Sequence, residues 1–235
     1  MQPVNLYAAD LRLTESPRYA RYCNITEIAE PPLDVAVASL WLDPEGLMLI
    51  NPALSPPLRL SSSLLERRAK GESLLLRATG LSKGGGTVLD AFAGFGLDAL
   101  TMVHAGAEAS AVERNPLVWL MMAEYAERLG LPLETCCEDS AEVLQDTERV
   151  WDVVYLDPMF PTRRKRALPN LALQHLQSLS AAADALTAAD VEAWLALAQA
   201  CATRRVVLKR RPKEPVVGKP SHQVQGQSVR FDVYV

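Results

Sequence analysis

Short apolar runs recur along the chain from Thr87 onward, and each ends at an acidic or turn-forming residue. The runs at 88–91, 109–113, 133–137 and 151–156 have the length and composition of buried strands. The segments between them are long enough for helices. Alternation of this kind predicts an α/β fold, Rossmann-like, with a mostly parallel sheet and helices on both faces.

The expected helices carry clear end signals. Asn115 stands at the N-cap of one helix, Pro116 at its first position, and Gly130 just past its end. Thr187 and Asp190 have the spacing of a capping box. The other elements expected here are a helix at about 97–105, a short helix after Asp139-Ser140, Ala-rich helices within 170–202, a strand at 205–209 and a terminal strand at 228–235.

The first 80 residues have a different pattern. They are rich in proline and show no alternation of strands and helices, but apolar runs on both sides of Asp43-Pro44-Glu45-Gly46 predict a β-hairpin. The segment 61–77 is basic and partly helical in pattern, although Gly71 weakens the helix. We therefore expect a small N-terminal α+β lobe over 1–80 and a larger domain over 81–235.

Composition places the chain among globular proteins. It has 235 residues, of which 49% are hydrophobic, and no apolar run is long enough to span a membrane. The first residues lack the basic-then-apolar order of a signal peptide, so we expect a cytoplasmic protein. The four cysteines have no metal-ligand spacing, which favours reduced core thiols and no metal site.

The charge distribution is uneven. The net charge is −4, which argues against indiscriminate binding of nucleic acid. Segments 59–83, 163–166 and 204–219 nevertheless hold 17 of the 24 basic residues and only three of the 28 acidic ones. This pattern favours a localised phosphate-binding face over scattered surface charge, which is the alternative. The candidate RNA-binding residues are Arg67, Arg68, Arg163, Arg164, Lys165, Lys209 and Arg210.

A glycine-rich turn follows the first strand of the larger domain. Gly94-Phe95-Gly96-Leu97-Asp98-Ala99 fits the nucleotide-binding pattern G-x-G-x-x-(G/A), in which glycines let the backbone approach a ligand. The pattern alone also fits a dinucleotide such as NAD. Asp90 precedes the turn, and its carboxylate would repel a pyrophosphate but suit a sulfonium-bearing methionyl group. The turn therefore favours S-adenosylmethionine as the ligand.

Acidic residues stand at four predicted strand ends: Asp90, Glu113, Asp139 and Asp157. Ligands of parallel sheets bind outside these ends. Glu113 could accept both ribose hydroxyl hydrogens, and Asp139 could accept from an adenine amine, with Ser140 beside it. The alternatives are simple helix capping by Asp139-Ser140 and a surface role for Arg114, which follows Glu113.

The sharpest signal is Asp157-Pro158-Met159-Phe160 after a buried run. A carboxylate, a rigid proline turn and an aromatic ring together suit a planar base with an exocyclic amine. Asp157 and the turn carbonyls would accept the amine hydrogens, and Phe160 would stack on the ring. Asp157, Pro158 and Phe160 are thus the candidate catalytic residues. The alternative is an ordinary Asp-Pro turn.

These motifs resemble those of the small-subunit ribosomal RNA guanine-N2 methyltransferase J family. The resemblance is carried by Leu89-Asp90-Ala91-x-Ala93-Gly94-x-Gly96-x-Asp98, by Glu113-Arg114-Asn115-Pro116, and by Val154-Tyr155-Leu156-Asp157-Pro158-Met159-Phe160-Pro161 with Arg163–Arg166 behind it. It implies a class I methyltransferase fold, S-adenosylmethionine (SAM) as methyl donor, and guanine N2 of small-subunit rRNA as target.

The resemblance also implies where the cofactor lies. The family's cofactor positions map onto Leu97-Asp98, Glu113-Arg114, Asp139-Ser140 and Asp157. Leu97 stands where the family has arginine, which favours a backbone role there. Met159 replaces the second proline of broader amino-methyltransferases but agrees with this family.

The expected function is therefore methyl transfer from SAM to a guanine amine of small-subunit rRNA, free or in a ribosomal particle. No membrane, metal or oligomer is implied. Other amino-directed methyltransferases, acting on adenine, DNA or protein glutamine, share these motifs. An NAD-dependent oxidoreductase and a non-catalytic ribosome-assembly factor are the further alternatives.

Overall fold

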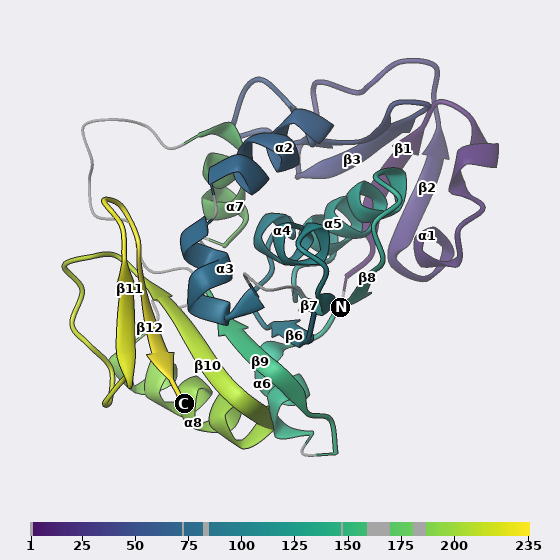
Figure 1. The fold of residues 1–235 in the computed structure, drawn as a ribbon. Helices are drawn as coiled ribbons and strands as arrows, with labels where there is room; N and C mark the ends of the chain where they lie inside the picture. Colours follow the sequence, from purple (N-terminus) through teal and green to yellow (C-terminus); the bar gives the residue numbers. More distant parts are fainter. Residues whose placement is uncertain (1, 72, 82–84, 147, 159–169, 181–186) are drawn as a thin grey trace.

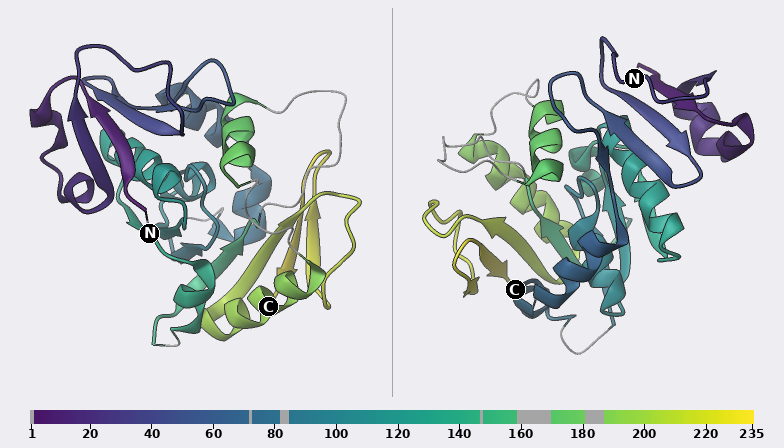
Figure 2. Two further views of the ribbon diagram at one scale, coloured as in Figure 1. Left: turned by 180° about the vertical axis from the view of Figure 1, so that it is seen from behind. Right: turned by 90° about the horizontal axis from the view of Figure 1, so that it is seen from above.

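The computed structural model of the chain describes residues 2–71, 73–81, 85–146, 148–158, 170–180 and 187–235. Within these residues the strands form a five-stranded and a seven-stranded sheet. The five-stranded sheet lies at one end of the molecule, and the C-terminal strands of the larger sheet lie at the other (Figures 1 and 2).

The smaller sheet is built by the first 59 residues and has the order β2-β1-β3-β4-β5. Its elements are β1 (Val4–Ala8), the 3-10 helix η1 (Leu11–Thr14), α1 (Pro17–Tyr22), β2 (Cys23–Glu27), β3 (Ser39–Asp43), β4 (Gly46–Ile50) and β5 (Leu58–Arg59). The predicted hairpin is confirmed as β3 and β4, which pair antiparallel.

The expectation that this part has no alternation of strands and helices is wrong. β1, α1 and β2 form a strand–helix–strand unit in which β2 runs parallel to β1, and β3 runs parallel to β1 on its other side. The helix of this unit has only six residues. A helix of fewer than two turns cannot display the 3.6-residue periodicity that marks longer helices in a sequence.

The larger sheet has the order β11-β12-β10-β9-β6-β7-β8. Its strands are β6 (Thr87–Asp90), β7 (Glu108–Val112), β8 (Leu133–Cys136), β9 (Trp151–Leu156), β10 (Ala202–Arg210), β11 (His222–Gln225) and β12 (Arg230–Tyr234). Strands β10, β9, β6, β7 and β8 are parallel, as predicted. The expected terminal strand is confirmed as β12, which pairs antiparallel with β10. The additional strand β11, which pairs antiparallel with β12 at the edge of the sheet, was not predicted.

The helices are α2 (Ser62–Gly71), α3 (Ser73–Thr79), α4 (Leu97–His104), α5 (Pro116–Arg128), α6 (Ser140–Gln145), α7 (Leu171–Ser180) and α8 (Ala188–Cys201). Alternate side chains of β9 lie on opposite faces of the larger sheet, and each face is covered by helices. Val153 and Tyr155 pack with α3 and α4, whereas Val154 and Leu156 pack with α6 and α8. The predicted helices on both faces are confirmed.

The helix ends follow the sequence signals. The Asn115 side chain caps α5 by accepting from the backbone N–H of Leu117 at 3.0 Å. The Thr187–Asp190 capping box of α8 is complete: Thr187 N–H donates to Asp190 Oδ2 at 2.7 Å, and Asp190 N–H donates to Thr187 Oγ1 at 3.2 Å.

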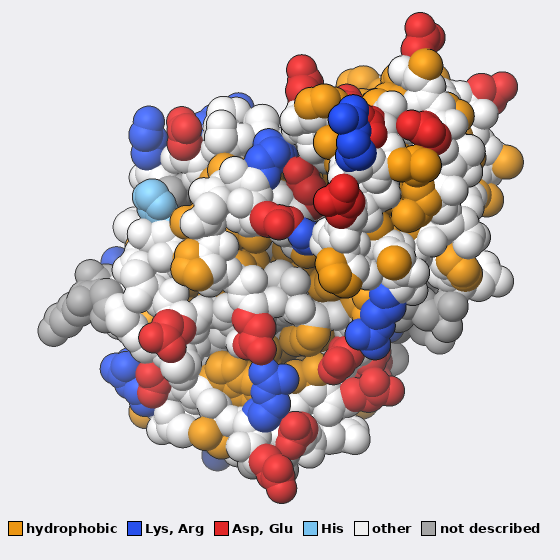
Figure 3. All heavy atoms as spheres, turned by 90° about the vertical axis from the view of Figure 1, so that its right-hand side faces the viewer, with side chains coloured by type: hydrophobic (Ala, Val, Ile, Leu, Met, Phe, Trp, Pro, Cys, Tyr) orange, Lys and Arg blue, Asp and Glu red, His pale blue; other side chains and the backbone are white. Residues whose placement is uncertain are grey.

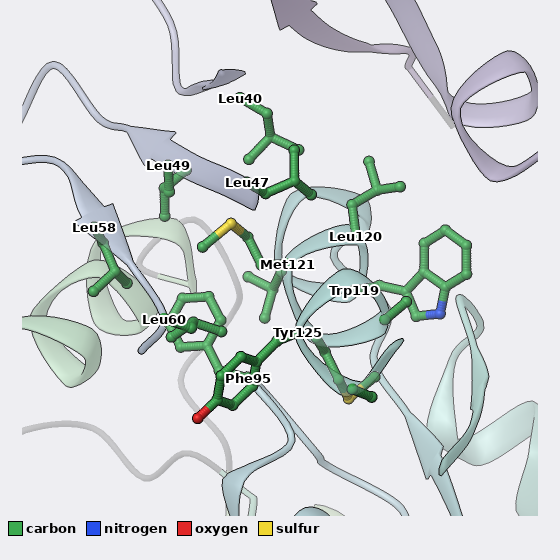
Figure 4. Close-up of a cluster of buried hydrophobic side chains, with 14 of the residues drawn as sticks. Leu40, Leu47, Leu49, Leu58, Leu60, Phe95, Trp119, Leu120, Met121 and Tyr125 are labelled. Atoms are coloured by element: carbon green, nitrogen blue, oxygen red, sulfur yellow. The ribbon is translucent and has the colours of Figure 1, made fainter. Parts of the chain in front are cut away.

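One of the three hydrophobic clusters of the described residues joins the smaller sheet to α4, α5 and Ala111 of β7. Leu40, Leu47 and Leu49 of the smaller sheet pack against the α5 side chains Leu120 and Met121 (Figure 4). Each fully buried leucine contributes about 1.5–3 kcal/mol. The N-terminal sheet is therefore held to the rest of the chain by core packing.

The surface beside the smaller sheet carries interspersed acidic and basic side chains, without a continuous basic area (Figure 3). Among the described residues, no helix is long and apolar enough to cross a membrane.

Candidate functional site

The strand order reverses beside β6. From β6 the chain moves outward through β7 and β8 and then returns to β9 on the other side of β6. In parallel sheets such a reversal opens a crevice at the carboxyl ends of the two central strands. Asp90 ends β6, and Asp157 follows the last residue of β9. The topology thus brings these two predicted site residues to the same place.

The turn after β6 is fixed by both neighbouring strands. The Ala91 N–H donates to the Tyr155 carbonyl of β9 and the Ala93 N–H to the Val112 carbonyl of β7, each at 3.0 Å. Backbone bonds on two sides hold the turn in one conformation. A ligand at the carboxyl edge would meet a pre-formed surface.

The two glycines of the turn have left-handed backbones, with φ of 56° at Gly94 and 73° at Gly96. A Cβ on Gly96 would lie 2.7 Å from Met122 Cγ of α5, and one on Gly94 would lie 3.2 Å from Leu176 Cδ1 of α7. Helix packing therefore requires glycine at 96, in addition to the close ligand approach that the sequence pattern predicts. Leu97 is half-buried at the start of α4.

Glu113 connects the glycine turn to the end of β7. Its Oε2 accepts from the Gly94 N–H at 3.1 Å and its Oε1 from the Asn115 N–H at 2.7 Å. Burial raises the pKa of Glu113, and these backbone donors partly oppose the shift. A carboxylate has about four acceptor sites, so two remain for hydroxyl donors of a ligand.

Asp90 is almost completely buried, with 1% of its surface exposed. Its Oδ1 accepts from the Phe92 N–H at 3.3 Å. Burial raises the pKa of Asp90 well above its ordinary range, and the carboxylates of Asp98 and Asp157 add to the shift. A ligand that brings positive charge or hydrogen-bond donors would offset this cost.

Asp139 and Ser140, which follow β8, already make hydrogen bonds within the protein. Asp139 Oδ1 caps α6 by accepting from the Ala141 N–H at 2.8 Å, and its Oδ2 lies 3.8 Å from Arg114 Nη1. The Ser140 hydroxyl donates to the Ala91 carbonyl and ties α6 to the turn after β6. Asp139 remains 44% exposed, so capping leaves part of its carboxylate open to a ligand.

Asp98, expected to contact the cofactor, lies in a buried network of charged and polar side chains. Its Oδ1 accepts from Arg68 Nε at 2.8 Å, and its Oδ2 accepts from Lys209 Nζ at 2.7 Å and the Tyr155 hydroxyl at 2.8 Å. Burial alone would raise the pKa of Asp98, but Lys209 and Arg68 hold it well below its usual range. Arg68 and Lys209, expected to meet RNA, thus meet this carboxylate.

Asp157 is the end of the same network. Its Oδ2 accepts from Lys209 Nζ at 2.7 Å, and its side chain remains 35% exposed. Burial and the nearby Asp98 carboxylate raise the pKa of Asp157, while Lys209 opposes the shift and the exposure moderates it. Pro158 is buried behind it. Phe160 lies outside the described residues.

The sequence pattern had one signal for this contact. Leu156 of β9 and Leu208 of β10 are register partners in the parallel sheet, so the next residues along the two strands, Asp157 and Lys209, are neighbours. Both follow apolar runs in the sequence. Their pairing could have been inferred once β9 and β10 were placed side by side.

The remaining basic candidates differ in their surroundings. Arg67 is exposed and donates to the Ser63 carbonyl at 3.1 Å. Arg210 is buried, donates to the Pro215 carbonyl at 3.2 Å and pairs with Glu214 at 3.3 Å. The geometry leaves Arg67 available to a phosphate, whereas Arg210 holds the loop after β10. The other candidates, Arg163, Arg164 and Lys165, lie outside the described residues.

An open groove of about 530 Å³ lies between α1, α5 and β8, with Arg18, Glu127 and Leu133 in its lining. None of the four carboxyl-edge acids lines it. Among the described residues, no group of three or more His, Cys, Asp or Glu side chains could hold a metal ion. We therefore place the candidate site at the carboxyl edge, where the acidic residues lie, and not in this groove.

Comparison with known proteins points to one family. A family model described as SAM-dependent methyltransferase matches residues 60–235. A relative from Coxiella burnetii (strain RSA 331 / Henzerling II), named ribosomal RNA small subunit methyltransferase J, is 33% identical in an alignment that covers 97% of this chain and 95% of the relative. The protein of the same name from Pseudomonas fluorescens (strain SBW25) is 34% identical, over 86% of this chain and 85% of its own.

Solved structures agree in fold. A SAM-dependent methyltransferase from Neisseria gonorrhoeae superimposes with a TM-score of 0.74 at 23% identity, covering 99% of this chain and 96% of its own. The Thermus thermophilus 16S rRNA N2 G1207 methyltransferase, solved with AdoMet and guanosine, has a TM-score of 0.51 at 19% identity over 89% of this chain and 53% of its own.

Proposed function

Since the chain belongs to the ribosomal RNA small subunit methyltransferase J family of SAM-dependent methyltransferases, we propose that it methylates the exocyclic N2 amine of a guanine in small-subunit rRNA. The observation that carries this proposal is the position of Asp157. Its partly exposed carboxylate stands at the strand-order reversal, beside Asp90 and the turn that Glu113 holds. This is where donor and acceptor of the methyl group would meet.

The residues of the carboxyl edge fit SAM. Glu113 retains acceptor capacity for the two ribose hydroxyls, and Asp139 retains an exposed carboxylate for the adenine amine. Asp90 is a buried acid whose raised pKa a cationic methionyl group would offset. When bound, SAM supplies a methyl group on a sulfonium sulfur, which keeps the electron pair when the carbon–sulfur bond breaks.

Asp157 would orient the acceptor amine. The lone pair of the guanine N2 amine is delocalised into the ring, so the amine is a poor nucleophile until its hydrogens are held. By accepting an N–H, the Asp157 carboxylate would aim the nitrogen along the line of displacement, an effect of proximity and orientation. After the nitrogen–carbon bond forms, the surplus proton of the methylated amine can pass to this carboxylate or to water.

RNA would reach the site across exposed basic residues. Arg67 is exposed on α2, and the sequence places Arg163, Arg164 and Lys165 shortly after Asp157. We propose that these side chains contact phosphates, together with part of the lobe over 1–80, and that the larger domain over 81–235 carries out the chemistry in the cytoplasm. The pairing of Arg68, Lys209 and Arg210 with carboxylates within the protein removes them from this set.

The test is transfer of labelled methyl from SAM to deproteinised small-subunit rRNA and to small ribosomal particles, followed by digestion to nucleosides. The proposal expects the label in N2-methylguanosine with at least one of the two substrates. Label in methylated adenosine, or in protein, would instead support the other amino-directed methyltransferases. RNA binding without any transfer would support an assembly factor.

A further inference from the structure

Lys209 joins the Asp157 carboxylate to the protein interior. Its Nζ lies 2.7 Å from Asp157 Oδ2 and 2.7 Å from Asp98 Oδ2. Two charge-assisted hydrogen bonds from one ammonium group fix that group between the carboxylates. The Lys209 side chain is 22% exposed, so solvent screens these contacts only in part.

Asp98 is the fixed end of this arrangement. It is buried in α4, and Arg68 of α2 and the Tyr155 hydroxyl of β9 both donate to it. Its oxygens therefore receive donors from three separate elements, since Lys209 belongs to β10. A carboxylate held in this way cannot turn without breaking several bonds, so it provides a rigid anchor for the lysine.

The charge around Asp157 depends on the same lysine. The charged and titratable groups that face Asp157 within the described residues are Lys209 of β10, Asp98 of α4, Arg68 of α2, Asp90 of β6 and Tyr155 of β9. Without Lys209, three neighbouring acids would share the single cation of Arg68. Mutual repulsion among these carboxylates would then raise the pKa of each of them, including that of Asp157.

These contacts also argue against the phosphate contact that the sequence predicts for Lys209. To reach RNA, its ammonium group would have to leave two carboxylates at 2.7 Å. The loss would leave Asp98 buried beside Asp157 with less counter-charge. Breaking a buried pair by removing one partner is strongly unfavourable.

We propose that Lys209 is a positioning residue of the methyl-transfer site, which holds the Asp157 carboxylate in place and keeps it ionised to receive the amine hydrogens. The inference rests on the proposed function, because it assigns the amine to Asp157. It adds that Asp98 supports Asp157 through Lys209, and that Arg68 supports Asp98.

The first test measures Asp157 directly and needs no substrate. Carbon-13 carboxyl NMR of aspartate-labelled protein, with Asp157→Asn to assign the signal, gives the Asp157 pKa. An opposite charge at this distance lowers a carboxyl pKa by about 1–3 units. We expect Lys209→Met and Lys209→Gln to raise the Asp157 pKa by about 1 unit, since partial exposure weakens the effect. Lys209→Arg should restore it.

Arg128→Met is the matched control, because Arg128 forms a comparable half-buried pair with Glu124 on α5. It should leave the Asp157 titration unchanged. An unchanged Asp157 pKa in a folded Lys209→Gln protein would overturn the inference. Using two uncharged replacements guards against the failure of one to fold.

The second test is the pH profile of single-turnover methyl transfer. Loss of Lys209 should move the acidic limb of the profile to higher pH by the same ~1 unit, while the SAM affinity from calorimetry stays within about threefold. A purely structural role would lower the rate equally at every pH. That result would overturn the inference. If the unaltered protein transfers no methyl group, the proposed function is refuted, and with it the catalytic part of this inference. The NMR experiment would still test whether Lys209 keeps Asp157 ionised, because it needs no substrate.

Discussion

Three carboxylates at the carboxyl edge have three different surroundings. Glu113 accepts two backbone N–H groups, Asp90 accepts one, and Asp157 accepts the ammonium group of Lys209. The sequence predicts these acids because each follows an apolar run. It does not predict their donors, because Lys209 lies 52 residues from Asp157 and the pairing depends on which strands become neighbours.

At this scale, Glu113→Ala should weaken SAM binding by about 1–3 kcal/mol, the cost of leaving polar groups unpaired. The substitution removes the proposed ribose acceptor and also the acceptor of the Gly94 N–H. Titration calorimetry measures the change. Glu108→Ala is the control, because Glu108 is exposed at the opposite end of the same strand. Equal affinity in the two folded variants would remove Glu113 from the cofactor site.

Elements with clear end signals or clear apolar runs were predictable, and the unit formed by β1, α1 and β2 was not. The caps of α5 and α8 appear in the structure as the residue types imply. β1, α1 and β2 have five or six residues each. Asn5 interrupts β1, and Asn24 and Thr26 interrupt β2, so neither strand is a continuous apolar run like the one at 151–156. Both strands are placed by pairing, since β1 lies between β2 and β3.

The glycine turn allows a prediction at the element scale. Gly96→Ala and Gly130→Ala both place a side chain at positive φ, 73° and 65°, which costs about 1–2 kcal/mol. Gly130 has open space around it, whereas the new Cβ at 96 would lie 2.7 Å from Met122 Cγ. Overpacking adds about 1–3 kcal/mol at Gly96. Denaturant unfolding should therefore show the larger loss for Gly96→Ala, and equal losses would contradict the packing argument.

At the scale of the whole molecule, the boundary at residue 80 describes a change of sequence pattern, whereas the packing is continuous. The core around α5 includes Leu47 and Leu49 of the smaller sheet, and the Tyr125 hydroxyl donates to the Ser61 carbonyl at 2.8 Å. Composition could not reveal this contact, because a lobe with its own core and a lobe that shares one can have the same residue content.

A shared core predicts one cooperative transition. Leu47→Ala should lower the free energy of unfolding by about 2–5 kcal/mol, and both sheets should lose structure together. Leu33→Ala, at a leucine that is 66% exposed, should change stability little. Fluorescence and circular dichroism in urea give the two curves. A Leu47→Ala protein that unfolds in two separate steps would show that the lobe is an independent domain.

The central claim is that the Asp157 carboxylate orients the amine that receives the methyl group. Single-turnover methyl transfer to small-subunit rRNA at saturating SAM tests it most directly. Asp157→Asn keeps the shape of the side chain but turns an acceptor into an amide donor facing the amine hydrogens. The account predicts a rate at least about 100-fold lower, with SAM affinity retained and with Asp34→Asn, at an exposed acid, unaffected. A rate close to that of the unaltered protein would contradict the account.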